Sequence, residues 1–245
     1  MSISKRQEEI LTILHEIRHI SVEDLAKITY TSPSSIRRDL THLQNISLVK
    51  RTHGGVSIVG DGTDVAPLDY RMTQNTLAKK KLAKKASALL CDGQTIMLDG
   101  SSSASFMIPY IAQHKDVLLY TNNMITAINA IGYGIKTSCI GGVSVNGSAV
   151  LSGVESYRTV SSLNIDILFF SSYGIDERGI ITDPTQEENY LRSLMIERAG
   201  RSVFLCDSEK FGRRALYTLT GLESVYAAAF DVPYEALISE KTILL

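Results

Sequence analysis

The 245-residue chain is poor in cysteine and has no long apolar run. Its three cysteines, Cys91, Cys139 and Cys206, are odd in number and far apart, which argues against a disulfide framework and against a metal site. We expect all three to be buried packing residues. No apolar segment reaches the length of a transmembrane helix, and the first ten residues predict an amphipathic helix rather than a signal peptide. These absences favour a cytoplasmic protein with no metal, no cofactor and no membrane partner.

An excess of charge of one sign is also lacking, since 25 basic residues stand against 26 acidic ones. The charges are unevenly distributed. Residues 29–60 contain four Lys or Arg and a single acidic residue, whereas the chain after residue 60 contains 17 basic and 20 acidic residues. A local cationic surface suits contact with a nucleic acid, and the remainder suits a small-molecule sensor.

The chain is long enough, and with 44% hydrophobic residues apolar enough, for a large core and a small accessory domain. The segment GDGTDVAP at residues 60–67 lacks hydrophobic periodicity, which is typical of a linker. We predict one domain at residues 1–59, a linker at 60–70 and a second domain at 71–245. Residues 71–90 predict one long helix with a solvated lysine face (positions 79, 80, 81, 84 and 85) and Leu77 on its buried side.

Residues 21–56 contain the signals of two short helices and a hairpin. Ser21 is suited to cap the first helix and Ser32 the second, and Pro33 then occupies the first helical position, where its missing N–H costs nothing. The runs 48–51 and 56–59 are β-prone, and the two glycines between them suit a turn with positive φ. The order predicts a winged helix-turn-helix that binds double-stranded DNA.

The second of these helices has an apolar stripe of Ile36, Leu40 and Leu43, so its opposite, polar face is expected to meet DNA. Ser34, Arg38 and Thr41 point most directly away from the stripe, and Arg38 is the predicted base contact. Asp39 lies toward the core edge and is expected to orient a neighbouring arginine or the backbone. The predicted DNA-binding residues are Ser34, Ser35, Arg37, Arg38, Thr41, His42, Lys50, Arg51 and His53.

From residue 94 onward, short apolar strands alternate with amphipathic helices. This alternation predicts an α/β fold with a largely parallel sheet covered on both faces. The expected strands are 95–99, 117–121, 136–142, 165–172, 202–207 and 225–231, and the expected helices are 103–113, 124–131, 185–199 and 233–239. Ligands bind at the carboxyl ends of such strands, and the small-residue loop at 100–105 opens a helix in a way that suits a phosphate. The predicted ligand-binding residues are Asp99, Gly100, Ser101, Ser102, Ser103, Asn122, Gly142, Asp176 and Lys210.

Two sets of motifs resemble one family of bacterial proteins. The run SIRRDLTHLQNISLVKRTHGG at residues 35–55 is similar to the N-terminal signature of the DeoR family of transcriptional regulators. Asp99-Gly-Ser-Ser-Ser resembles that family's D-[SA]-G-T-T loop, Thr121-Asn122 its T-N step, and residues 207–212 its D-x-S-K-F-G segment. The resemblance covers nearly the whole chain.

This resemblance implies a repressor of a carbohydrate-utilisation operon. Its C-terminal domain would be related to sugar-phosphate isomerases, and a phosphorylated sugar would be the effector that controls binding to operator DNA. A homo-oligomer is expected, because one helix-turn-helix covers only a few base pairs and specificity usually requires two copies.

An isomerase-like enzyme with an appended DNA-binding module is the alternative. Moving a proton between adjacent carbons requires a positioned carboxylate and an acid, and the available groups are those of Asp99, Asp176, Glu187, Asp207 and Lys210. All five histidines, however, fall outside the predicted strand-end loops. A scaffold without a ligand would leave the converging polar loops without a role. We therefore predict a regulator and not an enzyme.

Overall fold

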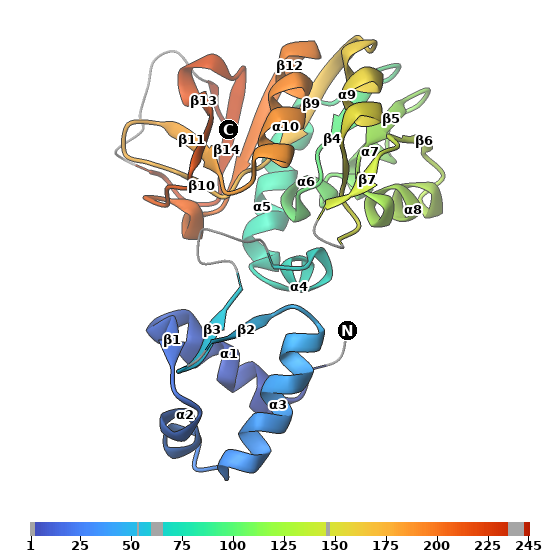
Figure 1. Cartoon of the computed structure of the whole chain (residues 1–245). Coiled ribbons are helices and arrows are strands. Elements are labelled where there is room, and N and C mark those ends of the chain that lie inside the picture. The colour runs from blue at the N-terminus through green and yellow to red at the C-terminus, as the bar shows by residue number, and fades with distance from the viewer. Residues whose placement is uncertain (1–2, 53, 60–65, 146–147, 235–242) are drawn as a thin grey trace. The chain divides into compact units, whose positions relative to one another are not determined.

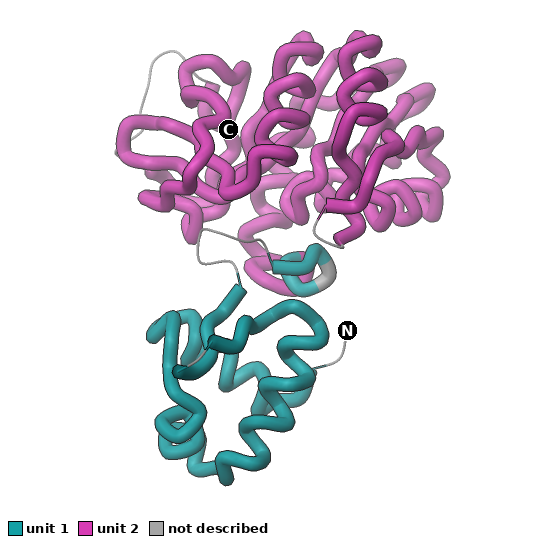
Figure 2. Tube along the Cα trace, in the orientation of Figure 1, with its two compact units in different colours: residues 1–71 teal, residues 72–245 magenta. Residues whose placement is uncertain are grey.

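The computed structural model describes residues 3–52, 54–59, 66–145, 148–234 and 243–245. The chain divides into two compact units, residues 1–71 and residues 72–245 (Figure 2). Each unit has a hydrophobic core of its own. Helix α4 (Leu68–Thr73) begins inside the predicted linker, whose residues 60–65 lie outside the described part.

In its described residues, the first unit contains three complete helices, the start of α4 and one small antiparallel sheet (Figure 1). The helices are α1 (Lys5–Ile17), α2 (Val22–Ile28) and α3 (Pro33–Asn45), and the strands are β1 (His19–Ile20), β2 (Val49–Thr52) and β3 (Gly55–Ile58). The strand order is β1-β3-β2. This arrangement confirms the predicted winged helix-turn-helix. Helix α3 starts as its sequence dictates, since the Ser32 hydroxyl accepts a hydrogen bond from the Ser35 N–H.

Asp39 joins α3 to α1 inside the core of this unit. Its buried carboxylate accepts hydrogen bonds from Arg6 Nε at 2.5 Å and from Gln7 Nε2 at 3.2 Å. The arginine that Asp39 orients therefore belongs to another helix, 33 residues away, and not to α3 itself.

The wing hairpin departs from its predicted turn geometry at Gly55. This residue does not have a left-handed φ. A Cβ atom at Gly55 would instead overlap the carbonyl oxygen of Ile20 on β1. The glycine is thus required by the close approach of β1 to β3, where Ile20 pairs with Val56.

The second unit is built on a seven-stranded sheet in the order β15-β14-β12-β9-β4-β5-β6. Every pair of neighbouring strands is parallel. The strands are β4 (Thr95–Leu98), β5 (Leu118–Thr121), β6 (Lys136–Cys139), β9 (Ile165–Phe170), β12 (Ala199–Cys206), β14 (Ala227–Phe230) and β15 (Ile243–Leu244). The predicted α/β fold with a parallel sheet is confirmed.

Alternate residues of the central strands supply two cores on opposite faces of this sheet. Ile167 and Phe169 of β9 belong to the first core, and Leu168 and Phe170 belong to the second. The first core is covered by α5 (Thr76–Ala86), α6 (Ser102–Ser105), α7 (Ile108–Ile111) and α8 (Met124–Gly132). The second is covered by α9 (Val154–Ser161), α10 (Gln186–Arg198) and a small sheet of β10 (Gly174–Ile175), β11 (Ile180–Asp183) and β13 (Tyr217–Gly221).

The remaining elements are short. Strand β7 (Val143–Ser144) pairs with β8 (Leu151–Ser152), and single 3-10 turns lie at Ser87–Leu89, Ser208–Lys210 and Leu222–Ser224. Of the predicted helices, 103–113 is divided between α6 and α7, and most of 233–239 lies outside the described residues.

The prediction of one long helix at residues 71–90 is wrong. Asn75 has a left-handed backbone, with φ of 50°, and separates α4 from α5. As a result Leu77 is 77% exposed, whereas Lys79 is buried and donates a hydrogen bond to the carbonyl oxygen of Gln74 at 2.7 Å. The side of α5 that faces the sheet is formed by Leu82, Ala83 and Ala86.

The cysteine prediction holds only in part. Cys206 is buried, and burial raises the pKa of its thiol, but Cys91 and Cys139 are exposed. No group of His, Cys, Asp and Glu within the described residues could hold a metal ion. No helix among the described residues is long and apolar enough to span a membrane.

Candidate functional site

The exposed face of α3 presents Arg38, Thr41 and His42. Arg37 is held by Glu23 of α2, with 2.9 Å between Nη2 and Oε1. The Arg38 guanidinium has no hydrogen-bond or ion-pair partner within the described part of the chain. Arg38 is therefore the arginine of this helix that is available to an outside acceptor.

The wing is tied to the same helix. Arg51 Nη2 donates a hydrogen bond to the Arg37 carbonyl oxygen at 2.7 Å, and Thr41 Oγ1 donates to that oxygen at the same distance. Lys50 is exposed on the adjacent strand position. Ser34 and Ser35 lie at the start of α3 within 3.0 Å of the Ser32 hydroxyl. His53, the remaining predicted contact, lies outside the described residues.

Tyr30, in the turn between α2 and α3, is a further candidate that is not among the DNA-binding residues predicted from the sequence. Its side chain is 98% exposed, and its φ of 49° is strained for an aromatic residue. Tyrosine hydroxyls donate to phosphates in protein–DNA complexes. A bulky aromatic residue in so tight a turn is the signal that could have found it.

In the second unit, Asp99 organises the carboxyl edge of the sheet. Its Oδ1 accepts hydrogen bonds from the Ser101 N–H at 3.1 Å and from Ser101 Oγ at 2.5 Å. Its Oδ2 accepts from the Ser171 N–H at 3.3 Å and from Arg192 Nε at 2.8 Å. Asp99 is buried, and four donors occupy its oxygens, so it fixes the loops after β4 and β9.

Arg192 connects this carboxylate to a second one. Its Nη1 donates to Asp183, and its Nη2 lies 4.0 Å from Glu188 Oε2. Asp183 also accepts the Tyr173 N–H at 3.2 Å. Burial lowers the pKa of the Arg192 guanidinium, but Asp183 and Asp99 outweigh that effect and raise the pKa above its ordinary value. Arg192 is therefore a permanently charged bridge in the core.

Neither Arg192 nor Asp183 is among the ligand-binding residues predicted from the sequence. Arg192 follows the buried Leu191 directly and lies one helical turn before the buried Met195. A charged residue on a buried stripe must be paired, because an isolated charge is too costly to bury. That placement was the available signal, but it did not identify the partners.

The loop after β4 is as buried as the strand itself. The Ser101 hydroxyl accepts the Ala104 N–H at 3.2 Å and thereby caps α6. Ser103 Oγ is buried and has no hydrogen-bond partner among the described residues. The same is true of Asn122 Oδ1 after β5, whose Nδ2 donates to the Leu151 carbonyl oxygen at 2.8 Å. Ser103 Oγ and Asn122 Oδ1, at neighbouring strand ends, are therefore buried without a hydrogen-bond partner among the described residues.

Lys210 is joined through Ser171 to the hydrogen-bond network of Asp99, Ser101 and Arg192. Its Nζ donates to Ser171 Oγ at 2.6 Å and lies 3.9 Å from Asp207 Oδ2. The Ser171 backbone N–H in turn donates to Asp99. Asp99, Ser101 and Lys210 are thus part of one connected network, and their role in binding a ligand stays a prediction.

Gly142 and Asp176 are not joined to that network by their contacts. Gly142 has φ of 144°, and a Cβ there would overlap Ser156 Oγ, so its role is to allow close packing. Asp176 lies in the β10–β11 hairpin, where its Oδ1 accepts the Ile180 N–H at 2.9 Å. Burial raises the pKa of the Asp176 carboxyl, but hydrogen bonds from Ile180 and Arg178 prevail and lower it. Both residues have a local structural role.

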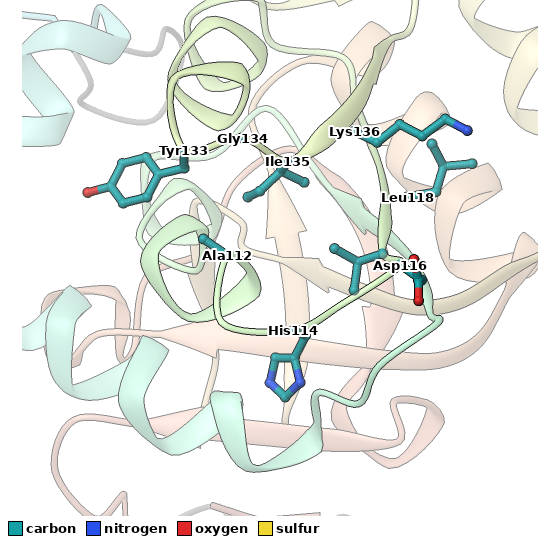
Figure 3. A pocket seen from close by; sticks show the side chains of 9 residues that line it. Ala112, His114, Asp116, Leu118, Tyr133, Gly134, Ile135 and Lys136 are labelled. Atoms are coloured by element: carbon teal, nitrogen blue, oxygen red, sulfur yellow. The ribbon is translucent and has the colours of Figure 1, made fainter.

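Two hollows in the described part of the chain differ in position: one lies away from this network, and the other borders it at Asp207, which lies 3.9 Å from Lys210. One, of about 440 Å³, opens at the amino ends of β5 and β6, which is the sheet edge opposite to the predicted site (Figure 3). There the side chains of His114 and Lys136 point away from each other, and His114 Nδ1 lies 3.1 Å from Asp92 Oδ1. The other, of about 450 Å³, is lined by the start of α5 and by the loop that contains Asp207.

Two family models match the chain in the order of its two units. A DeoR-like helix-turn-helix domain matches residues 6–61, and a DeoR C-terminal sensor domain matches residues 74–231. The chain belongs to the DeoR family. The regulator resemblance inferred from the motifs is confirmed, and it extends over both units.

Several relatives align over nearly their full length. The L-fucose operon activator of Haemophilus influenzae is 33% identical over 90% of this chain and 88% of that protein. The transcriptional regulator GolR of Listeria innocua is 28% identical over 90% of this chain and 87% of its own. The glycerol-3-phosphate regulon repressor of Escherichia coli is 24% identical over 95% of this chain and 92% of that protein.

Similar solved structures are more distant. The ribose 5-phosphate isomerase A of Methanocaldococcus jannaschii has a TM-score of 0.42 and 19% identity, and the match covers 56% of this chain and 55% of that one. The eIF2B delta subunit of Chaetomium thermophilum has a TM-score of 0.49 and 16% identity, and the match covers 68% of this chain and 60% of that one.

Replacing the Arg192 bridge tests its role in the core. Arg192→Met leaves Asp99 and Asp183 buried without their shared cation, so we expect a loss of about 3–5 kcal/mol in the free energy of unfolding. Urea denaturation followed by far-ultraviolet circular dichroism measures it. Arg158→Met is the matched control: Arg158 is exposed and pairs only with Glu155, so its loss should cost about 1 kcal/mol or less. Equal losses in the two variants would contradict the assignment.

Proposed function

We propose that the protein represses a carbohydrate-utilisation operon and that a phosphorylated sugar controls its affinity for operator DNA. The DNA-binding part of this proposal rests on Arg38, which lies on the exposed face of α3 and has no partner among the described residues. The neighbouring Arg37 is paired with Glu23, and Arg51 of the wing donates to the Arg37 carbonyl oxygen. A guanidinium with all its donors free can bind guanine O6 and N7 together in the major groove. Relatives named as repressor and as activator both exist, so the direction of control is part of the proposal.

The charges around Asp99 limit where the phosphate of a ligand can bind. The carboxylates of Asp99, Asp183 and Asp207 outnumber the cations of Arg192 and Lys210, and Arg192 is already paired. A phosphate is therefore best placed by Lys210 and by the loop that contains Ser102 and Ser103.

The unpartnered Asn122 oxygen adds a requirement of its own. Since Asn122 Nδ2 donates to the Leu151 carbonyl oxygen, Asn122 Oδ1 needs a donor, which a sugar hydroxyl supplies. A sugar phosphate meets the needs of Lys210, Ser103 and Asn122 together, which makes it the proposed effector.

Catalysis is not part of the proposal. A general base needs a carboxylate oxygen that is free to take a proton from the substrate. The oxygens of Asp99 accept four hydrogen bonds, and those of Asp183 are used by Arg192 and Tyr173. The relatives are named as regulators, which agrees with a sensor that binds its ligand without converting it.

Arg38 and Arg51 should affect DNA binding differently. An operator is first obtained by selecting duplexes from a random pool with the full-length protein. Arg38→Ala should then cost about 1–3 kcal/mol on that operator and much less on random DNA, whereas Arg51→Ala should weaken both more evenly. Fluorescence anisotropy at fixed salt measures both, with Arg158→Ala as the control. Equal losses on both duplexes for Arg38→Ala would remove its assignment as a base contact.

The effector loop is tested with a negative charge. Ser102→Asp places a carboxylate where the phosphate is proposed to bind, so sugar phosphates that raise the melting temperature of the wild type should no longer do so. Lys210→Met removes the neighbouring cation and should weaken the same shift. Ligand-free DNA affinity should be little changed in both. Undiminished ligand stabilisation in both variants would place the effector site elsewhere.

Coupling between effector and DNA is reciprocal. The sugar phosphate should weaken operator binding by a coupling free energy of about 1–3 kcal/mol, and operator DNA must weaken the sugar phosphate by the same factor. Calorimetric titration of the ligand with and without operator measures this factor from the ligand side. Identical ligand affinities in the two titrations would end the proposed effector role, even if both binding activities were real.

A further inference from the structure

The first turn of α10 contains two buried polar atoms that the proposed function does not use. Thr185 Oγ1 and Asn189 Nδ2 have no hydrogen-bond partner among the described residues. Both lie at the start of this 13-residue helix, and the Thr185 side chain does not cap it. Leaving such atoms without a partner costs free energy. They share this feature with Ser103 and Asn122 of the proposed effector site.

These two residues lie on the same side of α10 as the arginine that reaches Asp99. Thr185, Glu188, Asn189 and Arg192 are spaced at i, i+3, i+4 and i+7, which places them along one face of a helix. On that face, Arg192 Nε donates to Asp99 Oδ2 at 2.8 Å. The face that includes Thr185 and Asn189 is therefore the one turned toward the end of β4.

The direction of α10 places its first turn at the carboxyl edge of the sheet. The helix leads from β11 to β12, and β12 runs parallel to β9. A helix that returns the chain to the start of a parallel strand runs against the strands, so it begins at their carboxyl ends.

Strand β8 connects this turn to Asn122 through two consecutive residues. The Leu151 carbonyl oxygen accepts a hydrogen bond from Asn122 Nδ2 at 2.8 Å, and Ser152 Oγ donates to the Glu187 carbonyl oxygen at 3.1 Å. The first turn of α10 and the end of β5 therefore border the same region of the carboxyl edge.

The charges at this turn disfavour a second phosphate. Glu187 and Glu188 already compensate the positive end of the helix dipole, and Asp183 is buried just before the helix. The cation on this face, Arg192, is paired with two aspartates. A further anion would be repelled by these carboxylates, whereas a neutral polar group would not.

The hydrogen-bonding capacity of the unpartnered atoms indicates which neutral group fits. Asn189 Nδ2 is a donor and needs an acceptor, whereas Asn122 Oδ1 is an acceptor and needs a donor. The Thr185 hydroxyl can act as either. A sugar hydroxyl both donates and accepts, so neighbouring hydroxyl groups of one ligand can satisfy all three.

We propose that Thr185 and Asn189 bind hydroxyl groups at the end of the effector remote from its phosphate. This turn thereby selects sugar monophosphates with a neutral, hydroxyl-bearing end over sugar bisphosphates. The inference rests on the proposed function, in which Lys210 and the loop with Ser102 and Ser103 bind the phosphate.

The test is calorimetric titration of the full-length protein with three kinds of probe: sugar monophosphates of three to six carbons, bisphosphates of the same sugars, and inorganic phosphate. In the wild type, the monophosphate that binds most tightly should bind about 10-fold or more tighter than its bisphosphate. Asn189→Leu and Thr185→Val should each weaken that monophosphate by about 10-fold or more, because a ligand hydroxyl then loses its buried partner. Binding of inorganic phosphate should stay unchanged.

The melting temperature of the ligand-free variants separates binding from a structural role. Replacing an unpartnered buried amide by an apolar group removes a desolvation cost, so Asn189→Leu should melt at the wild-type temperature or above it. Gln186→Leu is the matched control: Gln186 is exposed in the same turn, and its replacement should change neither ligand binding nor melting.

Equal weakening of the monophosphate and of inorganic phosphate by Asn189→Leu, or a lower melting temperature of its ligand-free form, would overturn the proposal. Unchanged monophosphate binding in both variants, or a bisphosphate that binds the wild type as tightly as its monophosphate, would do the same. These results leave the proposed effector site in place. A wild type that binds none of the sugar phosphates would overturn that site together with this inference.

Discussion

The buried bridge from Asp99 through Arg192 to Asp183 is the interaction on which the polar edge of the sensor sheet depends. It brings a strand end, a helix and the small antiparallel sheet to one guanidinium. The remaining oxygens of the two aspartates then fix backbone N–H groups of Ser101, Ser171 and Tyr173. A buried ion pair need not make a net contribution to the stability of a fold, but removing its central cation leaves two buried carboxylates unpaired. Its stronger effect is on geometry, because it specifies how the loops after β4 and β9 lie.

This geometry decides which atoms remain for a ligand. The charged groups of the bridge satisfy one another. The buried side-chain polar atoms that have no partner among the described residues are therefore neutral ones: Ser103 Oγ and Asn122 Oδ1 after β4 and β5, and Thr185 Oγ1 and Asn189 Nδ2 at the start of α10. Lys210 adds a cation that is already oriented by Ser171. Such a site favours a ligand whose hydroxyl groups match fixed positions, because a buried donor or acceptor left unsatisfied costs more than a satisfied one gains.

Features with local causes were predictable from the sequence. The start of α3 follows from Ser32 and Pro33, and the central strands follow from short apolar runs. Most of the proposed binding edge follows from the rule for parallel sheets. The Arg192 bridge was not predictable, because Asp99 lies 93 residues from Arg192 and no local pattern pairs them. The break at Asn75 was missed for a related reason: strong helix formers lie on both sides of it, and neither Gly nor Pro marks the turn.

The two units use arginine in the same way. In the DNA-binding unit, Arg6, Arg37 and Arg51 are held by Asp39, by Glu23 and by a backbone carbonyl. In the sensor unit Arg192 is held by two aspartates. Fixed guanidinium groups set the shape of each site and restrict the side chains around it. In the proposed function, recognition then depends on few groups: Arg38 in one unit, and Lys210, Ser103 and Asn122 in the other. Lys210 and Asn122 are already held by hydrogen bonds, so little conformational entropy is lost when a ligand binds there, whereas the unpaired side chain of Arg38 has to be ordered when it binds.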